Sequence, residues 1–568
     1  MTASLASLPP GLLLIFGGLL LTLLRGRLQR IALVALPLAS AWQLLQFFPD
    51  GTLVQAQIFD YELTPVRIDR LSLVWGYVFH IAAFVSALYA FHVKDTLQHA
   101  SALVYAGAAI GAVFAGDLVT LFVYWELTAL SSVFLIWARK TERAFHAGMR
   151  YLVIQVGSGV VLLSGVLFHL HATGSLDFGA IGLESTGGKL IFLAFGIKAA
   201  FPFLHNWLQD AYPEATVTGT VFLSSFTTKL AIYALARGFA GTEILIPIGA
   251  AMTAFPIFFA VIENDLRRVL AYSLNNQLGF MVVGIGLGTQ MSLDGTAAHA
   301  FVHILYKALL FMSMGAVLLR TGTANGSDLG GLYKSMPWTT GFCIVGAASI
   351  SAFPLFSGFV AKSLILTEAA EQHRTVIYLI LLFASAGVFH HSGIKIPYFA
   401  FFGHDSGKRV EEAPRNMLWA MGLTAAACIA IGVFPHQLLY PLLPYPVDYQ
   451  PYTTSHVITQ IQLLLFSALA FTVLNRTGLY PPELRSTVLD TDWLYRKAAP
   501  TAIGWAYRTG RTVDRGVRAA FLGALSSFLG RSERAFNPKG LLGRTWSTRG
   551  MVLWATVLLA VCLVSYYL

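Results

Sequence analysis

About sixteen apolar runs, each long enough to cross a lipid bilayer, divide the chain from end to end. A membrane-spanning helix needs about 20 mostly apolar residues, because its length must match the thickness of the hydrocarbon core. The runs are centred near residues 18, 39, 82, 106, 127, 160, 198, 229, 254, 278, 308, 350, 388, 428, 465 and 559. The connectors between most runs are short and polar, so the sequence predicts an all-α polytopic membrane protein with about 14–16 transmembrane helices.

The composition agrees with lipid as the main solvent. Hydrophobic residues make up 56% of the chain and charged residues only 12%, whereas soluble domains carry about 25% charge. The net charge of +10 lies mainly in the connectors and in one late segment, and the excess of basic residues in cytoplasmic loops explains it without nucleic acid. The three cysteines form no CxxC pair, and the sequence predicts neither a cofactor nor a metal site.

The basic connectors indicate the orientation of the chain. Basic residues cluster within 25–30, 139–150, 267–268 and 408–415, and all four clusters fall on one side if every run crosses the membrane once. Acidic residues dominate the opposite connectors. The positive-inside rule then places the basic loops in the cytoplasm and both termini outside it. The expected location is the bacterial inner membrane.

One late segment, residues 477–548, is basic and too polar to cross a membrane. Basic and apolar side chains recur in it at helical spacing, which predicts an amphipathic helix that lies on the membrane surface or against a partner. A solvated linker helix is an alternative. The basic residues of this helix are Arg508, Arg511, Arg515 and Arg518, and the apolar residues are Val513, Val517, Phe521, Leu525 and Phe528.

Ionisable residues also occur inside the apolar runs, where a charge costs about 2.5–3.5 kcal/mol on insertion scales. Glu126 lies in LFVYWELTALSS, and its sequence neighbours include no cation. Lys198 and Lys229 lie in IFLAFGIKAAF and SSFTTKLAIYA. Any one of these residues alone is consistent with a structural ion pair, but the whole set predicts a function.

Helix breakers and a histidine row accompany these charges. Pro202 follows Lys198 by four residues and predicts a broken helix, with His205 after the break. In SISAFPLFSGFVAKSLIL, Pro354 and Gly358 interrupt an apolar run, and Lys362 lies one turn beyond. A row of three ionisable residues recurs every four positions, which places it on one helix face; it consists of His299, His303 and Lys307.

The residue types favour proton transfer. Lys, Glu and His can each be charged or neutral, whereas Arg does not release its proton in proteins. Broken helices with ionisable residues are typical of sites in transporters. The sequence contains no phosphate-binding loop, no dinucleotide-binding glycine motif and no nucleophile elbow, so nothing predicts an enzyme that acts on an organic substrate.

Five segments in this order resemble the antiporter-like subunits that Mrp-type cation/proton antiporters share with respiratory complex I. The resemblance covers roughly residues 70–405. The segments AYPEATVTGTVFLS and SDLGGLYKSMPWTT are most similar to the D-type Mrp subunit. The five segments are GDLVTLFVYWELTALSS, FPFLHNWLQDAYPEATVTGTVFLSSFTTKLAIYALAR, NDLRRVLAYSLNNQLGFM, HAFVHILYKALLFMSMGAV and FPLFSGFVAKSLIL.

The resemblance implies two inverted five-helix repeats, each with a half-channel. It implies that Glu126 and Lys198 are the paired residues of the first half, that Lys229 connects the halves, and that Lys362 is the broken-helix lysine of the second. His299, His303 and Lys307 then continue the central polar axis. Gln209 stands where relatives often have proline after the Trp-Leu pair, which leaves the shape of the loop near His205 open.

The resulting division of the chain has five parts. Residues 1–95 are N-terminal spans, 96–405 the antiporter-like core, 406–476 C-terminal spans, 477–548 the amphipathic segment and 549–568 a final anchor. The leading functional hypothesis is a proton-translocating subunit of an Mrp-like Na+/proton antiporter, which partners other membrane subunits. The alternatives are a proton-pumping subunit of complex I or a membrane hydrogenase, without its own redox centre, the membrane subunit of an inorganic-carbon uptake complex, and a structural scaffold with vestigial charges.

Overall fold

The computed structural model describes residues 8–485 and 488–568, and the chain divides into two compact units at residues 490 and 491. Within the described residues, twelve helices are long and apolar enough to cross a membrane. The predicted all-α membrane fold is confirmed, and the chain is a multi-pass membrane protein. The finer five-part division stays a prediction.

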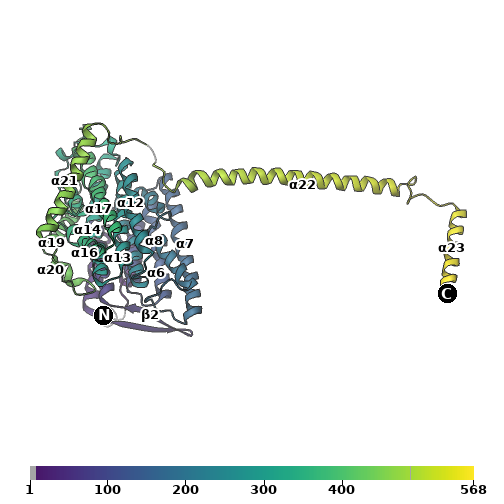
Figure 1. The fold of residues 1–568 in the computed structure, drawn as a ribbon, viewed down its shortest axis with the longest axis horizontal. Helices are drawn as coiled ribbons and strands as arrows, with labels where there is room; N and C mark the ends of the chain where they lie inside the picture. The colour runs from purple at the N-terminus through teal and green to yellow at the C-terminus, as the bar shows by residue number, and fades with distance from the viewer. Residues whose placement is uncertain (1–7, 486–487) are drawn as a thin grey trace. The chain divides into compact units, whose positions relative to one another are not determined.

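The first helices of the larger unit stand side by side in a bundle (Figure 1). The first predicted run forms a short helix and a 3-10 turn, and the following runs form one long helix each. Their bounds are α2 (Leu12–Leu20), η1 (Leu21–Leu23), α3 (Gly26–Phe47), α4 (Arg70–Tyr89), α5 (Thr96–Phe114), α6 (Leu118–Trp137) and α7 (Glu142–Thr173).

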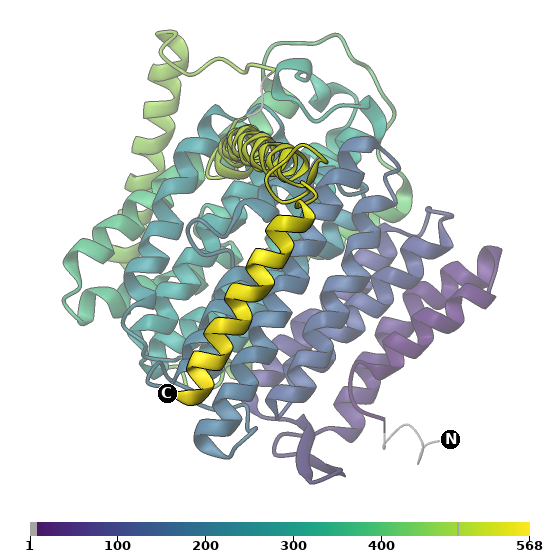
Figure 2. The ribbon, with the colours of Figure 1, turned by 90° about the vertical axis from the view of Figure 1, so that its right-hand side faces the viewer.

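The central part of the bundle contains short and interrupted helices as well as full spans. Figure 2 shows the same bundle from the side, with its long helices roughly parallel to one another. The bounds are α8 (Thr186–Lys198), α9 (Asn206–Ala211), η2 (Tyr212–Glu214), α10 (Gly219–Ser225), α11 (Thr227–Gly238), α12 (Leu245–Ile262), α13 (Leu266–Leu287), α14 (Gln290–Thr321), η3 (Gly326–Asp328), η4 (Leu332–Lys334), α15 (Pro337–Ile350) and α16 (Ser357–Glu371).

The last helices of this unit begin with a span whose second half is irregular. It starts as α17 (Thr375–Val388) and continues through the π-helical turns of η5 (Phe389–Ile394), the short α18 (Lys395–Pro397) and the π-helical η6 (Tyr398–Phe402). The remaining elements are α19 (Arg415–Val433), α20 (Pro435–Leu438), η7 (Tyr440–Leu442) and α21 (Thr454–Arg476).

Helix ends follow local sequence signals. Asp69, Asp117 and Ser185 precede α4, α6 and α8, and each side chain accepts a hydrogen bond from a backbone N–H of the first turn. Such caps satisfy donors that have no partner inside the helix. Gly174 ends α7 and Gly322 ends α14 in the left-handed conformation, which glycine adopts without steric cost.

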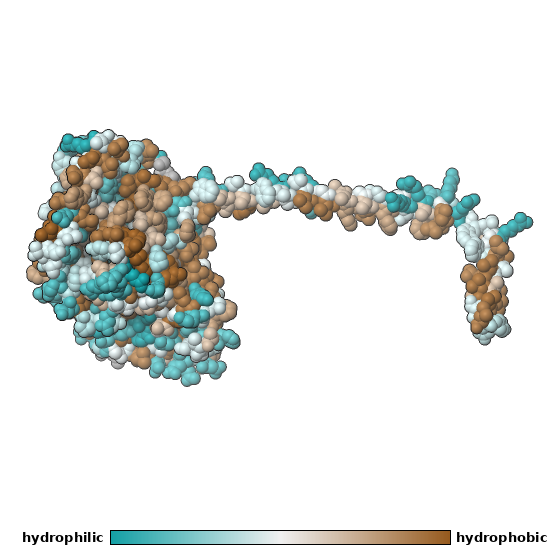
Figure 3. Space-filling view, in the orientation of Figure 1, coloured by the Kyte–Doolittle hydropathy of each residue, from teal (hydrophilic) through white to brown (hydrophobic). Residues whose placement is uncertain are grey.

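Helix α13 forms the centre of the core, because every residue from Leu266 to Leu287 is buried. It packs against α12 and α14. On the face of the bundle that Figure 3 shows, large hydrophobic areas lie beside hydrophilic ones, which gather toward its lower end. A buried helix that carries Asn275, Asn276 and Gln277 among apolar neighbours provides polar groups at membrane depth.

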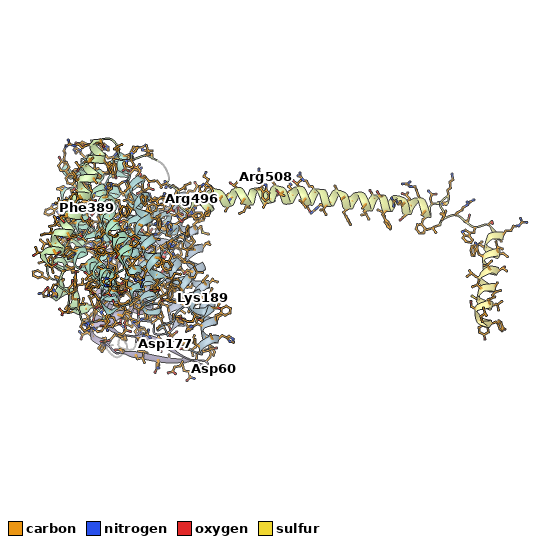
Figure 4. The ribbon with its side chains drawn as sticks, viewed as in Figure 1. Asp60, Asp177, Lys189, Phe389, Arg496 and Arg508 are labelled. Atoms are coloured by element: carbon orange, nitrogen blue, oxygen red, sulfur yellow. The ribbon has the colours of Figure 1, made fainter. Side chains whose placement is uncertain are left out.

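A β-hairpin that the sequence did not predict lies at one end of the bundle. Strand β1 (Leu53–Ile58) pairs antiparallel with β2 (Tyr61–Arg67), with Leu53 opposite Arg67. Arg67 forms an ion pair with Asp177 at 3.1 Å. Figure 4 labels Asp60 at the hairpin and Asp177 at the same end, with Phe389 in the opposite half of the bundle.

The second unit consists of η8 (Leu494–Ala498), α22 (Ala499–Phe536) and α23 (Thr548–Tyr567). The predicted amphipathic helix is α22, which has 38 residues and no buried side chain. Hydrophilic and hydrophobic residues lie along opposite edges of it (Figure 3). The predicted final anchor is α23, which is apolar over its length.

Candidate proton-transfer site

The first helix break is built as the sequence predicts. Helix α8 ends at Lys198, and α9 begins at Asn206. Between them Pro202 lies between two residues in the left-handed region, Ala200 with φ 63° and Phe203 with φ 68°. The left-handed conformation costs a non-glycine residue energy, so the surrounding packing must hold the break in place.

Lys198 points from this break toward α6. Its side chain is fully buried, and its Nζ donates hydrogen bonds of 2.8 Å to the Trp125 carbonyl oxygen and of 2.8 Å to Thr128 Oγ1. The ammonium also lies 4.2 Å from the centroid of the Trp125 ring. A buried ammonium needs such acceptors and ring contacts to persist at membrane depth.

Glu126 lies on α6 next to Trp125, but no ion pair within 4 Å joins it to Lys198 in the described structure. The charge of each residue still acts on the other. The Oε1 atom of Glu126 is buried and accepts no hydrogen bond from a described residue. The carboxylate packs against Gly159 of α7, where an added Cβ would overlap with Oε1.

Lys229 lies at a second irregularity, between α10 and α11. Its fully buried Nζ donates a 2.6 Å hydrogen bond to the carbonyl oxygen of Ser224, and its own carbonyl oxygen accepts a 3.0 Å hydrogen bond from Trp75 Nε1. Helix α11, which begins two residues before Lys229, packs against both α8 and α14. The charge of Lys229 acts on three residues of α14. These three residues are His299, His303 and Lys307.

The predicted row on α14 is fully buried. The rings of His299 and His303 lie 6.1 Å apart between centroids, as the four-residue spacing predicts. His299 Nε2 lies 3.2 Å from Gln277 Oε1 and 3.0 Å from the Tyr306 hydroxyl. Neither ring nitrogen of His303 nor Nζ of Lys307 has a hydrogen-bond partner among the described residues. Static ion pairs therefore do not account for this row.

The second break repeats the design of the first. Helix α15 ends at Ile350, and Pro354 again lies between two left-handed residues, Ala352 with φ 56° and Leu355 with φ 72°. Lys362 of α16 donates a 2.8 Å hydrogen bond back to the Ile350 carbonyl oxygen. Lys198 precedes its break and Lys362 follows its own.

Gly358 belongs to the first turn of α16, not to the break as expected from the sequence. An added Cβ there would overlap with the carbonyl oxygen of Ser349. Its function is close packing of α16 against α15, and the two left-handed residues around Pro354 make the break.

His205 lies directly after the first break and is 1% exposed. Its Nε2 lies 2.7 Å from Oδ2 of Asp490, and its ring packs 4.6 Å from that of Phe255. The structure therefore brings His205 into contact with a carboxylate 285 positions later in the sequence.

Two further ionisable residues belong to the irregular segment after α17. The sequence places His391 near a span end, where an interfacial position is expected, and does not single out Lys395. His391 is fully buried, although its place near the end of a predicted span favoured an interfacial position. Lys395 is also fully buried and pairs with Glu483 at 2.9 Å. A lysine within the apolar run before Pro397 was the available signal for this pair.

No cluster of three or more His, Cys, Asp or Glu residues with metal-binding geometry occurs in residues 8–485 and 488–568. Helices α8, α11, α14 and α16 pack against one another in that order. Lys198, Lys229, the α14 row and Lys362 therefore follow one another between the two breaks, and this series is called the central line. Such a line can hold and pass protons, because each of its residue types has a charged and a neutral form.

The comparison with protein families matches residues 115–434 to the family described as "NADH:quinone oxidoreductase/Mrp antiporter, TM". Hydrogenase-4 component B of Escherichia coli is 29% identical over 428 residues, which cover 66% of this chain and 63% of that protein. The chain therefore spans less than two thirds of that relative. The D-type component of the Na(+)/H(+) antiporter of Alkalihalophilus pseudofirmus is 29% identical over 60% of this chain and 72% of its own length.

Two solved structures share the fold. A chain of the Mrp complex from Dietzia sp. DQ12-45-1b matches with a TM-score of 0.69 at 21% identity, over 83% of this chain and 100% of that one. A chain of the membrane-bound sulfane sulfur reductase, an archaeal respiratory membrane complex, matches with a TM-score of 0.71 at 21% identity, over 98% of this chain and 100% of that one.

Proposed function

We infer a proton-translocating role for this chain from the family to which it belongs, the transmembrane subunits of NADH:quinone oxidoreductase and Mrp antiporters. The proposal is a subunit of a multi-subunit Mrp-like antiporter that exchanges a monovalent cation, Na+, for protons across the bacterial inner membrane. Its partners are the other membrane subunits of that complex. The relationship to an Na(+)/H(+) antiporter component supports this assignment.

One observation carries the proposal: a line of buried ionisable residues runs between two helix breaks of the same design. Lys198, Lys229 and the α14 row are fully buried, and Lys362 is 1% exposed. Placing so many ionisable groups at membrane depth costs free energy, and only a function at that depth maintains them. The matched breaks support two half-channels, one on each side of α14.

The position of each ionisable residue between the two breaks suggests its role in proton transfer. Glu126 and Lys198 load and release a proton in the first half, because their charges act on each other without a fixed ion pair. Lys229 passes protons toward His299, His303 and Lys307. Lys362 completes the line at the second break. His205 orients the first break through its contact with Asp490.

A second candidate function is a proton-pumping subunit of a redox-driven complex. The relationship to hydrogenase-4 component B and the fold match to the membrane-bound sulfane sulfur reductase favour it. In such a complex the same residues would pass protons, while other subunits would supply the redox reaction. The composition of the purified complex separates the two candidates, since only one of them includes redox subunits.

Transport by the reconstituted complex tests the proposal. The complex is purified through a tag on this chain, placed in proteoliposomes, and given an Na+ gradient while a pH-sensitive dye reports the internal pH. We expect proton movement in response to Na+, and its loss in a Lys307→Met complex of unchanged subunit composition. Full transport by the Lys307→Met complex would contradict the proposal that protons pass along the line of buried ionisable residues.

A further inference from the structure

The π-helical segment after α17 leads from the centre of the bundle to the side of the basic loops. Phe389–Ile394 and Tyr398–Phe402 are π-helical, and Pro397 between them lacks the backbone donor of a regular helix. π-Turns inside helices occur frequently at functional sites, because they reorient side chains. Here they place His391, Ser392 and Lys395 in the protein interior, each fully buried.

Lys395 lies at the end of α12. Its Nζ donates hydrogen bonds of 2.6 Å to the carbonyl oxygens of Val261 and Glu263, and it lies 2.9 Å from Oε1 of Glu483. Glu483 belongs to the connector after α21 and is 7% exposed at its side chain. Burial raises the pKa of the Glu483 carboxyl, against the opposing effect of Lys395.

A polar cavity of about 300 Å³ adjoins this pair through Glu263. Its lining comes from the first turns of α7 and α13 and from the connectors after α12, α14 and α21, on the basic-loop side. Oε2 of Glu263 is buried and accepts no hydrogen bond from a described residue. The cavity is lined by Arg143, Glu263, Asn264, Asp265, Arg268, Asn325 and Arg485.

His391 continues the path toward the central line. Its Nδ1 lies 2.8 Å from Ser392 Oγ, which donates a 2.8 Å hydrogen bond to Ser273 Oγ of α13. Its Nε2 is buried and has no hydrogen-bond partner among the described residues. His391 and Lys395 lie four positions apart on one continuous helical segment, η5 and α18. The charges of Lys395 and Lys307 both act on the His391 ring.

We propose that Glu483, Lys395 and His391 form a proton-entry branch that connects the polar cavity on the basic-loop side to Lys307. The branch rests on the proposed function, because it supplies the central line. None of its three residues belongs to the line between the two breaks.

Each transfer balances in protons. The Lys395 ammonium gives a proton to Nε2 of the neutral His391 ring and becomes an amine. His391 passes a proton to the Lys307 amine and is neutral again. Glu483, two positions before the cavity-lining Arg485, takes a proton from the cavity and gives it to the Lys395 amine, which restores the ion pair. The net result is one proton removed from the cavity and one delivered to Lys307.

The test uses the whole purified complex in the transport assay described above. In His391→Gln and Lys395→Arg complexes, we expect transport to fall by about tenfold or more, because a proton-transfer group has been removed. Lys395→Arg is decisive, since arginine keeps the charge and the hydrogen bonds but does not release its proton. His390→Gln is the matched control, because His390 packs on Phe471 and Tyr480 outside the branch; its transport should equal that of the unaltered complex.

A double variant separates a relay from a structural ion pair. Removing one partner of a buried pair leaves an unpaired charge, whereas removing both can restore stability. We expect Lys395→Met with Glu483→Gln to assemble normally and to stay at least about tenfold slower in transport. Normal transport by the assembled double variant, by His391→Gln or by Lys395→Arg would overturn the branch.

The two proposals fail separately. If Lys307→Met abolishes transport while the branch variants keep it, the branch is wrong and the proposed function stands. If Lys307→Met also keeps transport, the proposed function itself is wrong, and the branch fails with it.

Discussion

Lys198 donates a 2.8 Å hydrogen bond to the backbone carbonyl oxygen of Trp125 and forms no ion pair within 4 Å with the neighbouring Glu126 in the described structure. A closed ion pair would keep the lysine protonated. The open arrangement leaves both residues within each other's electrostatic influence but without a fixed contact. Movement of either side chain can therefore change the proton affinity of the other.

We expect Lys198→Ala and Glu126→Ala each to lower proton-coupled transport by at least about a hundredfold, as loss of an essential proton-transfer group does. Subunit composition should not change, since Lys198 is fully buried and Glu126 is half-buried with its Oε1 packed against Gly159. Lys189→Ala is the control, because Lys189 is an exposed lysine on the same helix α8. Normal transport by the Lys198→Ala complex would show that this lysine does not carry protons.

Gly159 offers a test of Glu126 that leaves every ionisable residue in place. An added Cβ at position 159 would overlap with Glu126 Oε1, the far end of a flexible side chain, so the carboxylate must move while the helix persists. Misplacement of a reacting group by about 1 Å can cost about a hundredfold in rate, and we expect Gly159→Ala to slow transport by about tenfold to a hundredfold.

Gly157→Ala is the control for this variant. Gly157 lies on the same helix α7, and an added Cβ there meets nothing within 4 Å. Alanine in place of a mid-helix glycine stabilises by about 0.5–1 kcal/mol. Transport by Gly157→Ala should therefore stay normal, and equal transport by the two variants would show that the position of Glu126 is unimportant.

The breaks and the central row could be predicted from the sequence, because their signals are local. Pro202 and Pro354 remove a backbone donor inside an apolar run, and a four-residue spacing places His299 above His303 on any α-helix. These two rules need no knowledge of the neighbouring helices. The structure confirms both, with a break around each proline and adjacent histidine rings.

The rest of the site depends on contacts between distant segments. His391 reads as an interfacial residue near a span end, and only the π-helical turns bury it. Glu483 and Asp490 lie outside every apolar run, yet they contact Lys395 and His205. Nothing in the spacing of these residues encodes such pairings, because they arise where the connector after α21 packs over the bundle.

Substitution of Lys229 can separate the effect of its charge from its ability to release a proton. Its Nζ donates to the Ser224 carbonyl oxygen between α10 and α11, and an arginine can make an equivalent hydrogen bond. Arginine does not deprotonate, so we expect Lys229→Arg to assemble but to transport about a hundredfold more slowly. Full activity would assign Lys229 a purely electrostatic role. Lys229→Ala, which removes both charge and hydrogen bond, calibrates the assay.

Helix α22 carries a basic edge and an apolar edge along 38 residues, and no side chain in it is buried. An amphipathic helix of this kind requires a membrane surface or a partner subunit for its apolar side. Truncation after residue 490 removes the helix and keeps Asp490, so the 2.7 Å contact with His205 stays available. We expect the truncated chain to insert normally but to copurify with several-fold less of its partner subunits.

Point variants separate the two edges of α22. Phe521→Ala with Leu525→Ala reduces the apolar edge, and Arg511→Ala with Arg515→Ala reduces the basic one. If α22 binds a partner through its apolar side, the first pair lowers copurification and the second pair leaves it closer to normal, because fully exposed charges add little affinity. Unchanged copurification by the chain truncated after residue 490 would show that α22 is not a docking helix.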